Sequence, residues 1–162
     1  MIRNIIILDD VGRHLFATNF GACHSLGEDS EALTGFISAL HSFGHDLSGS
    51  GVDEIQFGDL YILLLHRQNL IFALTADDDA AEKNKVKLGI ISDMFLKHYQ
   101  AVLSNLSDSD VLDSFAEFED LLLQNDLVMK NCGKLDDCSQ CPNRTKSLPL
   151  DMISGPTNDT ET

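Results

Sequence analysis

The sequence predicts an α+β fold, in which a five-stranded antiparallel sheet is flanked by helices in the order β-β-α-β-β-β-α-α. Two observations predict it. Five short apolar runs are separated by turn residues, which is typical of strands joined by hairpins. Three longer segments repeat their apolar residues every three or four positions, which is typical of amphipathic helices. At 162 residues, the chain can bury the core of one domain without disulfides or metal.

The first half of the pattern begins with strands at residues 2–8 and 14–20, joined by a turn that contains Gly12. A loop at residues 21–27 follows, and the acidic and serine side chains of residues 28–31 are typical of a helix start. Glycines in residues 48–51 end this helix. Its periodic apolar residues are Leu33, Phe36, Ile37, Leu40, Phe43 and Leu47.

Three further strands are predicted at residues 52–57, 60–66 and 70–75. Only two residues separate the first pair and three the second, so the strands should form an antiparallel meander. The middle run, LYILLL, is apolar on both faces. It is therefore expected either to be covered on both sides or to lie at a partner interface.

Two helices complete the predicted domain. Aspartates at residues 77–79 precede the first, whose apolar stripe is expected to comprise Val86, Ile90, Ile91, Met94, Phe95, His98 and Val102. The second begins at residues 107–110 and is expected to bury Val111, Phe115, Phe118 and Leu122. We expect a domain at residues 1–126, a cysteine-bearing segment at 127–150 and a disordered tail at 151–162.

The chain is strongly acidic, with 11 basic and 26 acidic side chains and a net charge of −15. This charge argues against binding to nucleic acid or to anionic lipid, because both require basic surfaces. The longest apolar stretch is interrupted by polar residues at 66–69, and the first ten residues do not form a signal peptide. A cytoplasmic protein without a transmembrane segment is expected.

The predicted order over residues 2–126 resembles the longin domain, a profilin-like module of vesicle-fusion proteins, adaptor-complex small chains and tethering complexes. The segments that carry this resemblance are IRNIIILDDVGRHLFATNF, EALTGFISALHSFGHDL and EIQFGDLYILLLHRQNLIFALTADD. Residues 36–78 are especially similar to small archaeal longin-type proteins, which accompany Ras-like GTPases. Two strands precede the first helix, which favours longin over the related roadblock fold.

The resemblance implies a module that binds rather than catalyses, and that meets its partners through the first helix and an edge strand. We expect the partner surface at Tyr61, Leu63 and Leu65, with Phe36 and Leu40; the alternative is that these residues are ordinary core. A small Ras-like GTPase or a longin or roadblock domain is the expected partner, in a process like membrane trafficking. A homodimer is a further candidate.

Three of the four cysteines lie in CGKLDDCSQCP, at Cys132, Cys138 and Cys141. Clustered thiols in a reducing compartment favour metal or redox chemistry over structural disulfides. Cys138 and Cys141 have the spacing of two zinc ligands, Cys132 could be a third, and Cys23 or His24 a fourth. An iron–sulfur cluster, a redox pair and free thiols are alternatives. A zinc- or thiol-dependent sensor is therefore the second functional hypothesis.

Sequence patterns of common enzymes are missing. The chain has no Gly-x-Ser-x-Gly motif, no phosphate-binding P-loop and no His-Glu-x-x-His motif. His41 and His45 are one helical turn apart and could chelate an ion, but a solvated helix face is the favoured interpretation. We expect a protein that is not an enzyme.

Overall fold

The predicted α+β fold is confirmed by a computed structural model that describes residues 1–20, 30–49, 51–58, 60–77, 81–105 and 113–129. The strands are β1 (Ile2–Asp9), β2 (His14–Asn19), β3 (Glu54–Phe57), β4 (Leu60–Arg67) and β5 (Leu70–Asp77). The helices are α1 (Ser30–Ser48), α2 (Ala81–His98), α3 (Gln100–Leu103) and α4 (Phe118–Gln124), with a 3-10 turn at Asp113–Phe115. The strands and the longer helices follow the predicted order.

The five strands form one antiparallel sheet in the order β2-β1-β5-β4-β3. The expected β1–β2 hairpin and the β3–β4–β5 meander are both present. They are joined at the centre of the sheet, where β1 pairs with β5 and Ile7 lies opposite Phe72. This pairing places the first and the last strand side by side and leaves β2 and β3 at the two edges.

Two tight turns set the register of these hairpins. In the β1–β2 turn, the Asp9 carboxylate accepts hydrogen bonds from the Arg13 backbone N–H at 2.7 Å and from Arg13 Nε at 2.8 Å. In the β4–β5 turn, Gln68 and Asn69 both have positive φ values, of 50° and 62°. Two such residues make a turn whose twist matches that of antiparallel strands.

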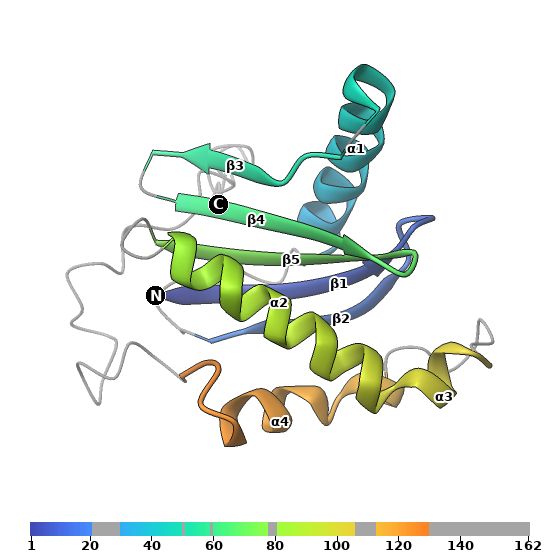
Figure 1. The fold of residues 1–162 in the computed structure, drawn as a ribbon, viewed down its shortest axis with the longest axis vertical. Helices are drawn as coiled ribbons and strands as arrows, with labels where there is room; N and C mark the ends of the chain where they lie inside the picture. Colours follow the sequence, from blue (N-terminus) through green and yellow to red (C-terminus); the bar gives the residue numbers. More distant parts are fainter. Residues whose placement is uncertain (21–29, 50, 59, 78–80, 106–112, 130–162) are drawn as a thin grey trace, which may run out of the picture.

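Alternating side chains of the sheet enter two separate cores, as their period of two requires. One core lies between the sheet and helices α2 and α4, and it takes Leu70, Phe72 and Leu74 from β5. The other lies under α1 and takes Ile71 and Ala73 from the same strand. Figure 1 shows the resulting three layers, with α2 in front of the sheet and α1 behind it.

The core on the α2 side is built around aromatic rings. Phe95 of α2 is fully buried, and its ring centroid lies 4.9 Å from Tyr99 and Phe118, 5.2 Å from Phe115 and 5.9 Å from Phe72. The pairs with Phe72 and Phe118 are edge-to-face, the arrangement that aromatic quadrupoles favour. One side chain therefore joins the sheet, α2, the 3-10 turn and α4.

A buried ion pair fixes the start of β1 against the end of β5. The Arg3 side chain is only 4% exposed, and its Nε donates to Asp77 Oδ1 at 2.8 Å. The Arg3 Nη2 donates to the same oxygen, and the Met1 amino group lies 3.5 Å from Asp77 Oδ2. Removing the Asp77 carboxylate, which is itself 31% exposed, would take away this compensation for the buried Arg3 charge.

The predicted apolar stripe of α2 is only partly correct. Ile91 and Phe95 are buried as expected, but Val86, Ile90 and Val102 are exposed. The buried face includes the polar residues Asn84 and Ser92 together with Leu88. The Ser92 Oγ donates a hydrogen bond to the Gly89 carbonyl at 2.7 Å. Because its hydroxyl is satisfied within the helix, this small polar side chain can occupy a core position.

The last predicted helix begins later than expected in the described structure, at Phe118. Phe115, Phe118 and Leu122 are fully buried, as predicted, whereas Val111 and residues 107–110 lie outside the described residues. Packing continues past the helix, where Leu127 and Val128 are buried in the α2-side core. The remainder of the predicted cysteine-bearing segment, from residue 130, and the predicted tail at 151–162 lie outside the described residues.

A search of the helices in the described ranges finds none that is long and apolar enough to cross a membrane.

The aromatic core gives a test of where stability resides. Replacing Phe95 by Ala should lower the free energy of unfolding by about 3–5 kcal/mol, because it removes a fully buried ring from a site bounded by four others. Urea denaturation followed by circular dichroism measures the change. Phe43→Ala is the matched control, because Phe43 is 62% exposed and its removal should change stability by no more than about 0.5 kcal/mol. Equal losses in the two variants would contradict this assignment of the core.

Candidate functional site

Helix α1 packs on the sheet only through its first half. Among residues 32–48, the buried side chains are Leu33, Thr34 and Ile37, and none after Ile37 is fully buried. Leu33 and Ile37 contribute to the smaller core, together with residues of β1, β4 and β5. The second half of α1 extends past the edge of the sheet formed by β3 (Figure 1). A helix of 19 residues thus covers the sheet with about two of its turns.

The outer side of α1 carries an apolar stripe that the domain does not bury. Phe36 is 41% exposed, Phe43 62% and Leu47 70%, and Leu40 between them is half-buried. Steps of four, three and four residues place these side chains on one side of the helix. Phe57 of β3 continues the stripe onto the sheet, because it is also exposed and its ring centroid lies 6.1 Å from that of Phe36.

We call these five residues the α1–β3 surface: Phe36, Leu40, Phe43, Leu47 and Phe57. Exposed apolar residues are normal when scattered, but a contiguous group is typical of an interaction site.

Strand β3 places one edge of the described sheet beside this surface. It is only four residues long and pairs with β4 alone, since it ends the strand order of the described sheet. Its other edge can therefore accept an added strand. The Lys85 Nζ of α2 lies 2.8 Å from Glu54 Oε2 at the start of β3, and the hydrogen bonds that Lys85 donates to Glu54 and then to Glu82 raise its pKa. This bond connects the edge strand to the opposite helical layer.

The structure separates the five residues predicted for partner binding into two groups. Phe36 and Leu40 belong to the α1–β3 surface. Leu63 is only 1% exposed and lies in the α2-side core, so its assignment to a partner surface is corrected. Leu65 packs against the same core, and Tyr61 is half-buried on β4. The run LYILLL is apolar on both faces because α1 and α2 cover it from opposite sides.

The predicted metal ligands Cys132, Cys138, Cys141 and Cys23, together with His24, lie outside the described residues. Within the described ranges, no three His, Cys, Asp or Glu side chains are arranged to hold a metal ion. The zinc hypothesis therefore stays a prediction.

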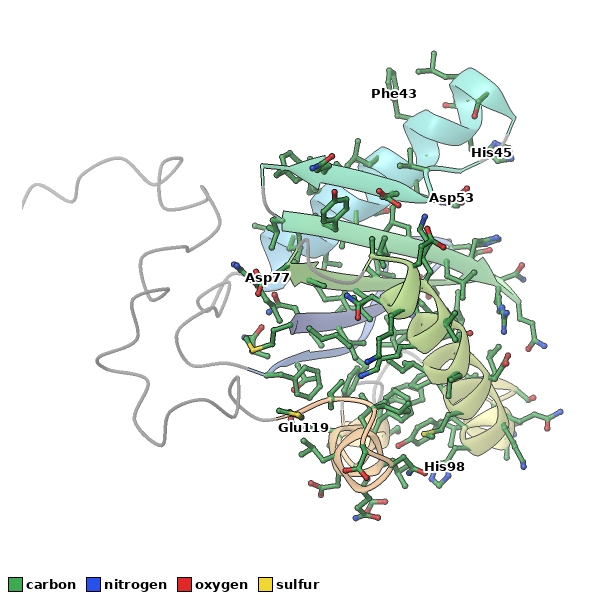
Figure 2. The ribbon with its side chains drawn as sticks, turned by 60° about the vertical axis from the view of Figure 1, so that its left-hand side comes forward. Phe43, His45, Asp53, Asp77, His98 and Glu119 are labelled. Carbon is green, nitrogen blue, oxygen red and sulfur yellow. The ribbon has the colours of Figure 1, made fainter. Side chains whose placement is uncertain are left out.

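A pocket of about 310 Å³ opens between the second half of α1, the connection to β3 and strand β4. Its floor is apolar, from Val52, Leu64 and Ile71, and its polar lining comprises His41, His45, Asp53 and His66. Figure 2 shows His45 and Asp53 on this side of the molecule, where α1 ends and the connection leads to β3. The sequence indicated the pairing of His41 with His45, but the approach of His66 depends on tertiary structure.

His41 is the most enclosed of the three histidines. Its ring centroid lies 5.1 Å from that of His66, with an interplanar angle of 31°. The backbone of Gly51 packs against the other part of the ring, so closely that a Cβ at this position would lie 2.8 Å from His41 Nδ1. Burial, followed by the charges of His66 and His45, lowers the pKa of His41.

The connection from α1 to β3 packs tightly on the helix because both contribute glycine. A Cβ at Gly44 would lie 2.6 Å from Val52 Cγ2 and 3.2 Å from the Val52 backbone N. Gly49 ends the helix with a φ of +70°, and its N–H donates to the His45 carbonyl at 2.8 Å. These glycines position β3 beside α1 and so bring Phe57 to Phe36.

Comparisons with known proteins give a limited result. No protein-family model matches the sequence, and no curated protein matches it either. A Roadblock/LC7 domain from Streptomyces avermitilis is a similar solved structure, with 14% sequence identity over 64% of this chain and 86% of that chain, and a TM-score of 0.48. A match of this size assigns neither a family nor a function, so the resemblance to longin domains remains a prediction.

Helix α1 offers a matched test of this close packing. Gly35 and Gly44 both lie within α1, but an added Cβ at Gly35 meets nothing within 4 Å. Gly35→Ala should stabilise the protein by about 1 kcal/mol through helix propensity. Gly44→Ala gains the same propensity but overpacks against Val52, so it should be less stable than Gly35→Ala by about 1–3 kcal/mol. Urea denaturation measures both, and equal stabilisation by the two substitutions would disprove the tight contact.

Proposed function

We propose that this protein is a non-enzymatic interaction module that binds a protein partner through the α1–β3 surface. The observation that carries the proposal is the stripe of Phe36, Phe43 and Leu47, which stays exposed on a helix whose other side covers the sheet. Burying an exposed aromatic or leucine side chain against a partner contributes about 1.5–3 kcal/mol for each residue that is fully covered. Burial of these side chains by a partner therefore contributes a large part of the free energy of binding.

The surface combines two known means of recognition. An amphipathic helix or groove can pack on the α1 stripe, and an extended segment can pair with the open edge of β3. The contact between Phe36 and Phe57 holds two of the rings in place before binding. Such preorganisation lowers the entropic cost of association, because fewer side chains have to be ordered by the partner.

We propose a small Ras-like GTPase, or a longin or roadblock domain, as the partner class, with the chain acting as scaffold or regulator in a membrane-trafficking-like process. The resemblance of residues 36–78 to longin-type proteins supports this choice. The net charge of −15 favours a partner with a basic surface near its apolar contact, because opposite charges accelerate encounter. A second copy of the chain is the alternative partner within the same proposal.

A charge placed in the stripe tests the surface. Phe43→Asp should weaken partner binding at least about tenfold, because an unpaired carboxylate would have to be desolvated at the interface. Val86→Asp is the matched control, since Val86 is an equally exposed apolar residue on α2. Isothermal titration calorimetry against candidate GTPases in each nucleotide state measures binding, and sedimentation velocity measures self-association.

Three outcomes would refute the proposal. Equal weakening by Phe43→Asp and Val86→Asp would show that charge itself, not this surface, matters. Binding that Phe43→Asp leaves intact would exclude the α1–β3 surface. Failure to bind any GTPase, longin or roadblock domain, together with a monomeric chain at all concentrations, would remove the function.

The spacing of Cys132, Cys138 and Cys141 supports a second candidate function, a zinc- or thiol-dependent sensor. We propose that these thiolates bind zinc, with Cys23 or His24 as the fourth ligand. Four protein ligands would give a closed, structural site, and metal loss or thiol oxidation would then act as the signal.

Metal analysis tests this second function. Protein purified under reducing conditions should contain about one zinc ion per chain, and a variant with Cys132, Cys138 and Cys141 replaced by serine should contain none. Cys23→Ser as a single variant decides between the two fourth ligands. A zinc content below about a tenth of an equivalent in the unaltered chain would rule out the metal site.

A further inference from the structure

In the second half of α1, the positions that continue the row of Leu33 and Ile37 are occupied by His41, which is partly buried, and by His45, which is exposed. Leu33 and Ile37 are the buried sheet-facing positions, and the next positions at helical spacing are His41, Gly44 and His45. Below them lies the pocket, with His66 of β4 in ring contact with His41. Titratable groups are thus part of the contact that holds this half of the helix, beside the close packing of Gly44 against Val52.

We propose that His41, His45 and His66 form a pH-sensitive contact, whose protonation detaches the second half of α1 from the sheet and thereby weakens the α1–β3 surface. The claim about the helix is independent of any partner. Only its consequence for binding rests on the proposed function.

Few other charges can compensate the imidazolium groups. Of the elements around the pocket, α1 contributes His41 and His45, β4 contributes His66, the connection to β3 contributes Asp53, and β5 contributes the uncharged Ile71. The single carboxylate that lines the pocket can therefore offset one positive charge but not two or three.

The charged residues that directly adjoin the polar lining residues in sequence are Asp46, Glu54 and Arg67. Asp46 is exposed on the helix, Glu54 is engaged with Lys85, and Arg67 pairs with Asp93 of α2. Two of these three are committed elsewhere, and none of the three lines the pocket. Positive charges on His41 and His66, whose rings are in contact, therefore repel each other with only Asp53 in the pocket to offset them.

The direction of the pH effect follows from linkage. Burial and the neighbouring histidines lower the pKa of His41, so the detached helix binds a proton more readily than the packed one. The packed state therefore has its full stability above the ordinary histidine pKa of about 6.5, and loses it as the pH falls below that value through the lowered pKa.

The histidine contact and the interaction surface lie on the same helical turns. Figure 2 shows Phe43 and His45 pointing to different sides of α1. Leu33 and Ile37 keep the first half anchored by apolar burial, which does not titrate. Movement is thus confined to the half that carries Phe43 and Leu47, and the stripe loses its alignment with Phe57.

Hydrogen–deuterium exchange on the whole chain tests the contact without any partner. Between about pH 7.5 and about pH 5.5, on either side of the ordinary histidine pKa, exchange at residues 41–48 should accelerate several-fold after correction for intrinsic rates. Amides of β1 and β5 should remain protected and serve as the internal reference. Chelator in every buffer keeps metal ions from the imidazoles.

A matched pair of variants identifies the groups responsible. The double variant His41→Gln with His66→Gln should show no acceleration at low pH, because His45 alone can still gain charge and no second imidazolium then faces it. His98→Gln should behave like the unaltered protein, since His98 is an exposed histidine at the other end of the fold. Unchanged exchange at about pH 5.5, or the same acceleration in the double variant, would overturn the proposal.

Binding measurements separate this inference from the proposed function. For a partner that binds at about pH 7.5, affinity should fall several-fold at about pH 5.5 in the unaltered chain and stay constant in the double variant. Equal pH dependence in both proteins would refute the link between contact and surface. If the exchange result holds and no partner binds at either pH, the proposed function fails and the helix contact stands.

Discussion

The structure depends on one constraint, which is that the central strands of the sheet are buried on both faces. All eight residues of β1 are buried, and so are all residues of β5 except Asp77. Each face therefore needs a helical layer, and the two layers are unequal. The α2 side has a thick core organised by Phe95, whereas the α1 side has a smaller one that needs only Leu33 and Ile37 from its helix.

Local sequence signals were sufficient for the order of the elements, because strand alternation and turn residues are short-range properties. They did not contain the pairing of β1 with β5, which joins residues about seventy positions apart. Nor did they identify the buried face of α2. Asn84 and Ser92 are inside while Val86 and Ile90 are outside, because helix α4 and the sheet determine which side is enclosed.

The candidate site was predictable to a similar extent. Phe36 and Leu40 were predicted because the longin resemblance directs partners to the first helix; Phe36 is exposed and Leu40 half-buried, and their role in binding stays a prediction. Leu63 was misassigned because an apolar run does not reveal how many layers cover it. The proximity of His66 to His41 could not be predicted either, since it arises only when β4 passes beneath α1.

The unequal layers explain why α1 can serve both core and surface. The sheet covers only the side of α1 that carries Leu33 and Ile37, so Phe43 and Leu47 on its outer side remain exposed for a partner. Here the sheet ends at β3 before the helix does, so the connection through Gly49 and Gly51 must turn back along α1. That return places Phe57 beside Phe36 and the backbone of Gly51 against His41. The connection from α1 to β3 therefore positions both the α1–β3 surface and the histidine contact. Because both lie on α1, we expect a change in the histidine contact to reach the surface through the packing of this one helix.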